Sequence, residues 1–226
     1  MTLLKSKYDY AKIQRKSIDG KRLYECPDGN AVASVTTILD KTKDKTHLME
    51  WRKRIGEKKA QEIVTEAAGR GTRMHKFLED YVETGVMPEP GTNPYSAQAH
   101  KMAGIIRDTA LVNLHEAWGQ EINLYFPQIY AGTTDLVGVY NGKEAICDYK
   151  QTNKPKKEEW VEDYYLQLVA YAEAHNEIHG TNIREGHIFM CSQDFQYQQF
   201  DLMPEKYDYW KDRWWKRVEQ YYMLNL

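Results

Sequence analysis

GTTDLVGVYNGKEAICDYK, residues 132–150, decides the fold of this 226-residue chain. An Asn-Gly pair between two alternating apolar runs is the strongest short signal for a two-residue β-hairpin turn, and Asn141-Gly142 is such a pair. A symmetrical turn pairs Tyr140 with Lys143. The same register places Asp135 directly opposite Asp148, so the hairpin is expected to bring two carboxylates together.

The opposed aspartates predict a bound cation. Side chains directly opposite on one face have Cβ atoms about 4.5–5.5 Å apart, and like charges at that spacing destabilise a sheet unless something neutralises them. A divalent cation there would polarise a phosphoryl oxygen and lower the pKa of a bound water. Lys150 lies two residues beyond Asp148 and so shares its face. Its ammonium would orient that water and stabilise the charge of a pentacoordinate phosphorane.

The alternative for this segment is a solvated hairpin with ordinary surface charges. Val137, Val139 and Ile146 share the face of the aspartates. Leu136 and Tyr140 lie on the opposite face. A hairpin with apolar residues on both faces is expected to be buried, and buried carboxylates need a partner.

The composition predicts a globular protein in a reducing compartment. With 42% hydrophobic and 28% charged residues and a net charge of −2, any polyanion site must be a local patch. Cys26, Cys147 and Cys191 are scattered, which argues against a disulfide framework, a zinc site or an iron–sulfur cluster. No apolar run approaches the ~18 residues of a membrane span. Charges within residues 5–12 interrupt any secretory signal. We expect a cytoplasmic, non-secreted protein with no membrane partner.

The periodicity of apolar residues predicts an α/β (α+β) protein with a mixed central sheet flanked by helices. Helices are expected from residue 34 to about 39, and over 46–67, 72–84, 95–112, 160–179 and 204–225, with strands over 115–126, 129–140, 143–150, 185–192 and 196–202. Gly69-Arg70-Gly71 is expected to separate two helices. Turn signals at Asp19-Gly20 and Pro27–Asn30 predict a small β-hairpin or meander. We expect one domain over residues 1–226, with that hairpin, about residues 8–34, as an extension.

Two pairs of polar residues each share a helical face because they stand at i and i+4. His75 and Glu79 form the first pair, and imidazole is a good ligand for Mn²⁺ or Fe²⁺. Gln167 and Tyr171 form the second, and an amide and a phenol on one face would hold a phosphate or a base, or order a catalytic lysine. Taken alone, each pair is more often an ordinary hydrogen bond or helix packing.

Basic residues gather in two places. Residues 41–59 hold eight Lys or Arg against three acidic residues, a net of +5 that includes Arg52 and Lys53. The second group follows the hairpin and consists of Lys154, Lys156 and Lys157 beside Lys150. Such groups predict salt-dependent phosphate binding, and the alternative is a solvated helix face. Aromatic residues of the last helix recur at helical spacing, which favours core packing over base stacking.

Together these residues resemble the PD-(D/E)XK nuclease superfamily, and specifically its RecB-like exonuclease branch. Four segments carry the resemblance in the family's order: Gly71-Thr72-x-x-His75-x-x-x-Glu79, Gly132-Thr133-Thr134-Asp135, Asp148-Tyr149-Lys150 and Gln167-Leu168-x-x-Tyr171. They span about residues 69–172. The resemblance implies a restriction-endonuclease-like core similar to that of stand-alone members, phage exonucleases among them. It adds nothing to residues 1–45 and 204–226.

The family's roles carry over by position. The resemblance implies that His75, Asp135 and Asp148 hold Mg²⁺ or Mn²⁺ with the backbone carbonyl of Tyr149, and that Lys150 is the catalytic lysine. Gln167 and Tyr171 would support that lysine or contact DNA. Glu79 and Glu121 are additional acidic candidates. Lys154, Lys156, Lys157, Arg52 and Lys53 are the candidates for DNA contact. The cysteine cluster by which some relatives bind an iron–sulfur centre is absent from this sequence.

The resemblance therefore implies a metal-dependent deoxyribonuclease that hydrolyses phosphodiester bonds from DNA ends, with a preference for single strands, in a bacterium or a phage-infected cell. Its expected partner is DNA. The same residues would also serve a structure-specific endonuclease such as a junction resolvase. From other classes, a DNA-binding module with a vestigial site and a metal hydrolase for another substrate are the alternatives. The intact acidic, lysine and glutamine positions and the neighbouring lysines argue against these last two.

Overall fold

The computed structural model describes residues 3–18 and 21–224. The hairpin of residues 132–150 is the centre of its sheet, formed by β5 (Tyr130–Tyr140) and β6 (Lys143–Thr152). The register runs from Tyr140 opposite Lys143 to Leu136 opposite Cys147, which is the symmetrical turn that the sequence predicts. Asn141 and Gly142 both have positive φ, +48° and +77°, as a two-residue turn between twisted strands requires. Asp135 and Asp148 stand one step beyond the last pair of this ladder.

The described residues form an eight-stranded mixed sheet. The strands around the hairpin are β1 (Gln14–Ile18), β2 (Lys21–Glu25), β3 (Ala31–Ser34), β4 (Leu114–Phe126), β7 (Glu185–Ser192) and β8 (Tyr197–Leu202). They follow the order β1-β2-β3-β5-β6-β7-β8, and β4 pairs with β5 on its other edge. The β3–β5 and β6–β7 pairs are parallel and the other pairs are antiparallel. The predicted mixed sheet is confirmed.

The sheet opens along one edge of β5, and the gap there between β3 and β6 is called the fork. Along that edge, β3 pairs with Tyr130 and Ala131, whereas β6 pairs with Leu136–Tyr140. Residues 132–135 lie between the two partners and have no ladder pair on this edge. These four residues are the Gly-Thr-Thr-Asp segment. The chain therefore places its first acidic motif where the sheet opens.

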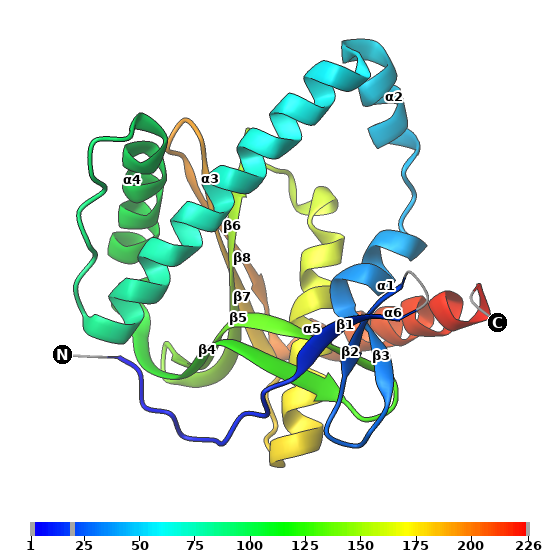
Figure 1. Ribbon diagram of the computed structural model, residues 1–226. Helices are drawn as coiled ribbons and strands as arrows, with labels where there is room; N and C mark the ends of the chain where they lie inside the picture. Colours follow the sequence, from blue (N-terminus) through cyan, green and yellow to red (C-terminus); the bar gives the residue numbers. More distant parts are fainter. Residues whose placement is uncertain (1–2, 19–20, 225–226) are drawn as a thin grey trace.

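Helices cover both faces of the sheet (Figure 1). They are α1 (Val35–Thr42), α2 (Thr46–Ile55), α3 (Glu57–Thr84), α4 (Pro94–Thr109), α5 (Glu162–His179) and α6 (Pro204–Met223), with short 3₁₀ turns at Leu111–Asn113 and Glu158–Trp160. Helices α3 and α4 pack on one face, over a core that includes Leu136, Tyr140 and Cys147. Helix α5 packs on the other, over Val137 and Ile146. The hairpin is buried on both faces, as its apolar pattern predicts.

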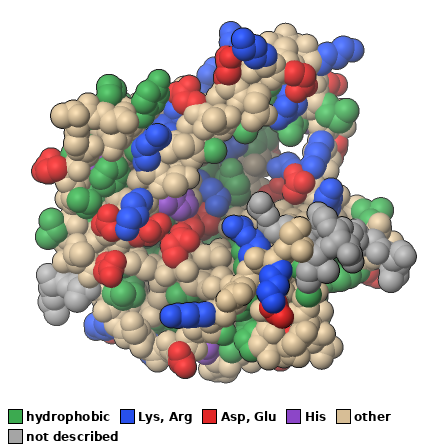
Figure 2. All heavy atoms as spheres, viewed as in Figure 1, with side chains coloured by type: hydrophobic (Ala, Val, Ile, Leu, Met, Phe, Trp, Pro, Cys, Tyr) green, Lys and Arg blue, Asp and Glu red, His purple; other side chains and the backbone are tan. Residues whose placement is uncertain are grey.

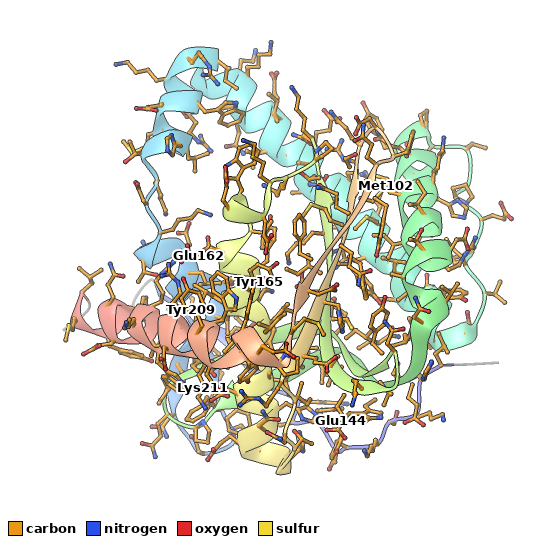
Figure 3. All side chains as sticks on the ribbon, turned by 180° about the vertical axis from the view of Figure 1, so that it is seen from behind. Met102, Glu144, Glu162, Tyr165, Tyr209 and Lys211 are labelled. Atoms are coloured by element: carbon orange, nitrogen blue, oxygen red, sulfur yellow. The ribbon has the colours of Figure 1, made fainter. Side chains whose placement is uncertain are left out.

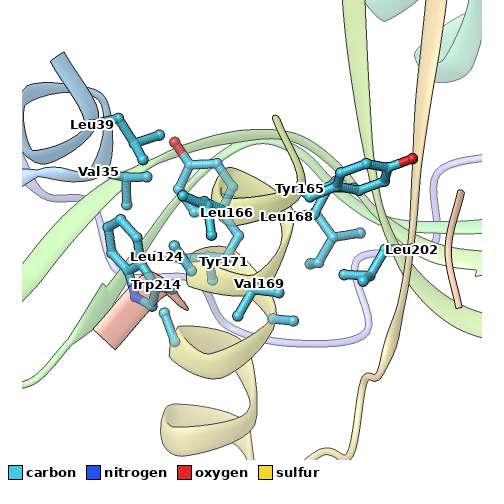
Figure 4. Close-up of a cluster of buried hydrophobic side chains, with 14 of the residues drawn as sticks. Val35, Leu39, Leu124, Tyr165, Leu166, Leu168, Val169, Tyr171, Leu202 and Trp214 are labelled. Atoms are coloured by element: carbon cyan, nitrogen blue, oxygen red, sulfur yellow. The ribbon is translucent and has the colours of Figure 1, made fainter. Parts of the chain in front are cut away.

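The core between α5 and the sheet is extended by residues of α1 and α6. Figure 4 shows Leu166, Val169 and Tyr171 of α5 packed with Val35 and Leu39 of α1. From behind, Figure 3 shows α6, with Tyr209 and Lys211, lying across α5, and α4, with Met102, at the other side of the sheet. Burying this apolar area contributes most of the favourable free energy of folding, at roughly 25 cal/mol per Å².

One predicted break is wrong. Helix α3 continues through Gly69 and Gly71, and the chain breaks instead at Gly56, whose φ of +87° suits glycine. The reason is tertiary contact. A Cβ on Gly71 would lie 3.1 Å from Cγ of Gln151, so glycine lets the helix approach the end of β6. A glycine inside a helix costs about 1 kcal/mol relative to alanine, which this close packing and the buried Arg70 offset.

The remaining boundaries agree with the predictions to within a few residues. Ser34 caps α1 by accepting a hydrogen bond from the backbone N–H of Thr37, and Pro94 opens α4 with Asn93 as its cap. The N-terminal meander is present as β1–β3 and joins the main sheet through β5. Its predicted turn at Asp19-Gly20 lies outside the described residues. No helix of residues 3–18 and 21–224 is both long and apolar enough to cross a bilayer.

Candidate metal and catalytic site

Asp135 lies at the fork and ties the two central strands together. Its Oδ2 accepts a hydrogen bond from the backbone N–H of Tyr149 at 2.7 Å. A side-chain carboxylate therefore binds β6 just past the point where the regular β5–β6 ladder stops. The motif Asp148-Tyr149-Lys150 is held beside the Gly-Thr-Thr-Asp segment by this contact.

His75 reaches the fork from α3. Its Nε2 lies 2.9 Å from the carbonyl oxygen of Tyr149, and its Nδ1 lies 3.6 Å from Oδ1 of Asp135. A carbonyl oxygen only accepts, so Nε2 carries the proton in the neutral ring and Nδ1 turns its lone pair toward the carboxylate. A lone pair facing a carboxylate is unfavourable unless a proton or a metal ion lies between them.

Glu121 completes a group of three possible ligands. One ligand atom from each of His75, Glu121 and Asp135 lies within 4.8 Å of the others. Glu121 stands across from Asp135 in the β4–β5 register, between Gln120 opposite Leu136 and Ile122 opposite Thr134. Its φ of +48° is unusual for a residue other than glycine. This left-handed backbone interrupts the ladder at the residue that joins the acidic group.

Carboxylates at the fork raise one another's pKa. Desolvation by the surrounding protein, followed by repulsion from Asp135, Glu79 and Asp148, raises the pKa of Glu121 to about 7. The pKa of Glu79 is also raised, chiefly by burial. Figure 2 shows acidic and histidine side chains side by side on the face that α3 crosses. A concentration of negative charge of this kind is stabilised by a cation.

The buried Asp148 forms an ion pair with the partly exposed Lys150, and Gln167 contacts both. The Asp148 side chain is 3% exposed, and its Oδ2 lies 2.5 Å from Nζ of Lys150. Gln167 of α5 donates from Nε2 to Oδ1 of Asp148 at 3.2 Å and accepts from the Lys150 ammonium at 3.4 Å. Burial raises the pKa of Asp148 against the opposing effect of Lys150. Burial also opposes the charge of Lys150, but Asp148 and Asp135 outweigh it and raise the pKa of that ammonium.

Tyr171, one turn after Gln167, packs on the first residue of the Gly-Thr-Thr-Asp segment. A Cβ on Gly132 would lie 2.9 Å from the Tyr171 hydroxyl, so any other residue would push the ring away. Burial raises the pKa of Tyr171 well above its ordinary value, which keeps the phenol neutral. Tyr171 therefore fixes the fork from the α5 side, while His75 approaches from the α3 side.

Arg70 is a site residue that sequence reasoning missed. It is buried in α3, and its Nε donates to Oε1 of Gln151 at 3.0 Å while a terminal nitrogen donates to Asn153. It also pairs with Glu66. These bonds tie the segment that follows Lys150 to the helix that carries His75. The sequence signal was a charged residue between two glycines, which reads as a helix break.

The structure does not bring every predicted residue into one group. Asp148 lies outside the three-ligand group and is engaged by Lys150 and Gln167. Lys154, Lys156 and Lys157 lie on the loop that follows β6. Arg52 and Lys53 lie on α2, and α3 separates them from His75 by about 27 Å, counted from Glu57 at 1.5 Å per residue. Arg52 is also paired with Glu57 at 2.8 Å.

The donor set fits a hard divalent cation. Mg²⁺ and Mn²⁺ take carboxylate and carbonyl oxygens, and Mn²⁺ also accepts imidazole. His75, Glu121, Asp135 and the Tyr149 carbonyl supply such donors at the fork. The described residues place no cysteine among them, so the set does not resemble a structural zinc site.

The comparisons with known proteins point to nucleases. No protein-family model matches the chain. Mitochondrial genome maintenance exonuclease 1 of Homo sapiens is 29% identical over 210 residues, covering 85% of this chain and 58% of that protein. The proteins of the same name from Mus musculus and Xenopus tropicalis are each 27% identical, covering 85% and 84% of this chain and 59% and 57% of those proteins. The chain thus spans less than three-fifths of the curated relatives it matches.

Among solved structures, the one titled "Crystal structure of SSO0001" matches with 12% identity and a TM-score of 0.44, covering 85% of this chain and 75% of that one. That likeness is too low to support an argument about function. The exonuclease relatives, found by sequence over most of the chain, support a nuclease family for this protein.

Proposed function

We propose that this chain is a metal-dependent DNA exonuclease of the RecB-like branch of the PD-(D/E)XK superfamily. One observation carries the proposal. The fork gathers His75, Glu121 and Asp135 within 4.8 Å and sets the buried Asp148–Lys150 pair beside them. A cation site next to a lysine ammonium is the arrangement that hydrolysis of a phosphodiester needs. The names of the relatives point to the same reaction.

In this proposal one group of residues holds a cation and a second group positions Lys150. His75, Glu121 and Asp135, with the Tyr149 carbonyl and with Asp148 as a further carboxylate, would hold Mg²⁺ or Mn²⁺. The ion supplies Lewis acidity toward a phosphoryl oxygen and a lowered pKa for a bound water. Lys150 is kept charged by Asp148, so it stabilises the negative charge that develops on the phosphate. Gln167 fixes both partners of that pair.

DNA is the proposed substrate because basic and aromatic side chains follow the catalytic lysine directly. Lys154, Lys156 and Lys157 precede Trp160, whose side chain is 56% exposed. The ammonium of Lys157 lies 5.4 Å from the centre of the Trp160 ring. An exposed ring beside cations offers a base-stacking surface, and unpaired bases stack more readily than those in a duplex. We therefore propose a preference for single strands.

The test is digestion of end-labelled single- and double-stranded oligonucleotides and of a circular single strand in Mg²⁺. We expect nucleotides to be released from the linear single strand, no cutting of the circle, and loss of activity with EDTA. Asp148→Asn should abolish release. Asp212→Asn, which removes an exposed carboxylate on α6, is the matched control and should remain active. Cutting of the circle would favour the endonuclease alternative. Binding without cleavage in Mg²⁺ or Mn²⁺ would favour a DNA-binding module.

A further inference from the structure

A polar pocket opens from the fork toward the N-terminal meander. Its volume is about 470 Å³, within the range of about 300–1,000 Å³ that small-molecule sites occupy. It is lined, among others, by Arg15, Glu121, Asn123, Thr133, Gln167 and Tyr171. Glu121 belongs to the candidate metal group, and Gln167 holds the Asp148–Lys150 pair. The pocket therefore shares a wall with the proposed catalytic site.

Arg15 and Asn123 offer the pocket hydrogen-bond donors that the described residues do not use. The Arg15 guanidinium has no carboxylate within ion-pair distance among the described residues, whereas its neighbour Lys16 is paired with Glu25. Asn123 accepts from the Thr133 hydroxyl at 3.1 Å, which leaves its amide N–H groups available. Thr36 adds a hydroxyl from the start of α1, which also contacts the Ser34 hydroxyl at 3.0 Å. A planar guanidinium with amide and hydroxyl donors is suited to a phosphate group.

Three less polar side chains complete the pocket wall. Ile13 and Tyr24 of the meander are buried and line the pocket, together with Tyr171 of α5. The exposed edges of these two phenol rings and of this aliphatic side chain can contact a sugar or a base. Phosphate-binding donors and these edges within a space of this size suit one nucleotide.

We propose that this pocket receives the terminal nucleotide of the DNA strand and that Arg15 binds its phosphate. The inference rests on the proposed function, since it sets the scissile phosphate at the shared wall formed by Glu121 and Gln167. It also gives the N-terminal meander a role in substrate binding. A site for one terminal nucleotide favours removal of nucleotides from an end over cutting within a strand.

The first test measures ligand binding and does not depend on catalysis. Calorimetric titration of the full chain with dAMP, deoxyadenosine and inorganic phosphate, with and without Mg²⁺, is compared for wild type, Arg15→Ala and Lys16→Ala. We expect Arg15→Ala to weaken dAMP binding at least tenfold and to leave deoxyadenosine unchanged. Lys16→Ala removes the same charge from the next residue of β1 and should change dAMP binding less than twofold. Unmeasurable dAMP binding to wild type, or equal losses in both variants, would overturn the proposal.

The second test separates this proposal from the nuclease assignment. With a single-stranded oligonucleotide, Arg15→Ala should raise KM about tenfold and leave kcat within twofold, while Lys16→Ala leaves both unchanged. If Arg15→Ala hydrolyses DNA with the KM of wild type, the pocket proposal is refuted and the nuclease assignment stands. If the wild-type chain hydrolyses no DNA but binds dAMP through Arg15, the nuclease assignment is refuted and the nucleotide pocket stands. Circular dichroism melts of both variants check that the fold is retained.

Discussion

Two histidines on helices at opposite faces of the sheet show how a structural residue differs from a candidate ligand. His175 of α5 is fully buried, and both of its ring nitrogens have hydroxyl partners, Tyr10 at 3.1 Å and Thr181 at 2.8 Å. His75 of α3 is 25% exposed and meets a backbone carbonyl on one side and Asp135 on the other. The first ring is satisfied by neutral groups, while the second faces excess negative charge.

The two histidines differ in the groups that surround each ring. Around His175 the protein supplies aromatic rings of Tyr8, Trp118 and His179, so the ring behaves as part of the core. Around His75 it supplies the carboxylates of Glu121 and Asp135. We conclude that residue type and helical position do not distinguish the two histidines, but the charge of their neighbours does. Substitutions should therefore separate activity from stability.

The largest expected effect is on activity, at Lys150 in the charged surroundings of His75. Lys150→Ala should lower the rate of DNA hydrolysis about 10³-fold, because removal of one preorganised group that stabilises developing charge costs about 10²–10³-fold and Asp148 also loses its partner. The measurement is single-turnover cleavage of a labelled strand. Lys216→Ala on α6 is the matched control. A Lys150→Ala enzyme within tenfold of wild type would contradict the role of the lysine.

His75→Ala should affect activity and leave stability nearly unchanged. We expect the Mn²⁺ concentration for half-maximal activity to rise about 10–100-fold, in line with the removal of a group that supports a metal site. The urea midpoint should stay close to that of wild type, because this ring is partly exposed. Equal metal dependence in the variant and wild type would place His75 with the structural histidines.

His175→Gln should change the pH dependence of stability and spare catalysis. Burial, with smaller contributions from His179 and Lys7, lowers the pKa of His175 to about 3. Between about pH 6.5 and 3 the unfolded chain binds a proton that the native ring does not, so stability falls as the pH drops through this window. From pH 7 to pH 5, wild type should lose roughly 2 kcal/mol more than the variant at about 1.4 kcal/mol per pH unit. Parallel urea-unfolding curves at both pH values would contradict this.

The smallest expected effect belongs to the loop after β6. Replacing Lys154, Lys156 and Lys157 by Gln should weaken single-strand binding and reduce the slope of log K against log salt by about 0.7 for each phosphate that these lysines neutralise. Fluorescence anisotropy at several salt concentrations gives the slope. The same substitutions at Arg52, Lys53 and Arg54 of α2 test the distant basic group, and a larger change there would move the DNA path toward α2.

The central hairpin could be predicted from sequence because its rules are local. A two-residue Asn-Gly turn sets the register, and alternation sets the buried faces. The continuity of α3 could not be predicted in this way, since Gly71 is explained by Gln151, eighty residues away in the chain. The hairpin also predicted opposed aspartates, but the ladder ends one step before them and Asp135 binds the Tyr149 backbone instead.

The site shows the same division. His75, Asp135 and Lys150 follow from short motifs, and the structure places them together. Glu121 joins them only because β4 crosses β5 in one register with a left-handed residue at that point. Arg15 reaches the same fork from the meander because β3 pairs with β5. Arg15 stands in no pattern that the sequence displays, and Glu121 was a candidate only through the family resemblance.

The proposed function depends most on the fork being a cation site that serves hydrolysis. The direct measurement is a Mn²⁺ titration by electron paramagnetic resonance, run on the same samples as single-strand cleavage, for wild type, Asp135→Asn and Asp212→Asn. We predict that bound Mn²⁺ and cleavage rate rise along one curve in wild type and Asp212→Asn, and that Asp135→Asn loses both. Cleavage without bound Mn²⁺ or another divalent ion, or Mn²⁺ binding that Asp135→Asn leaves unchanged, would contradict the account.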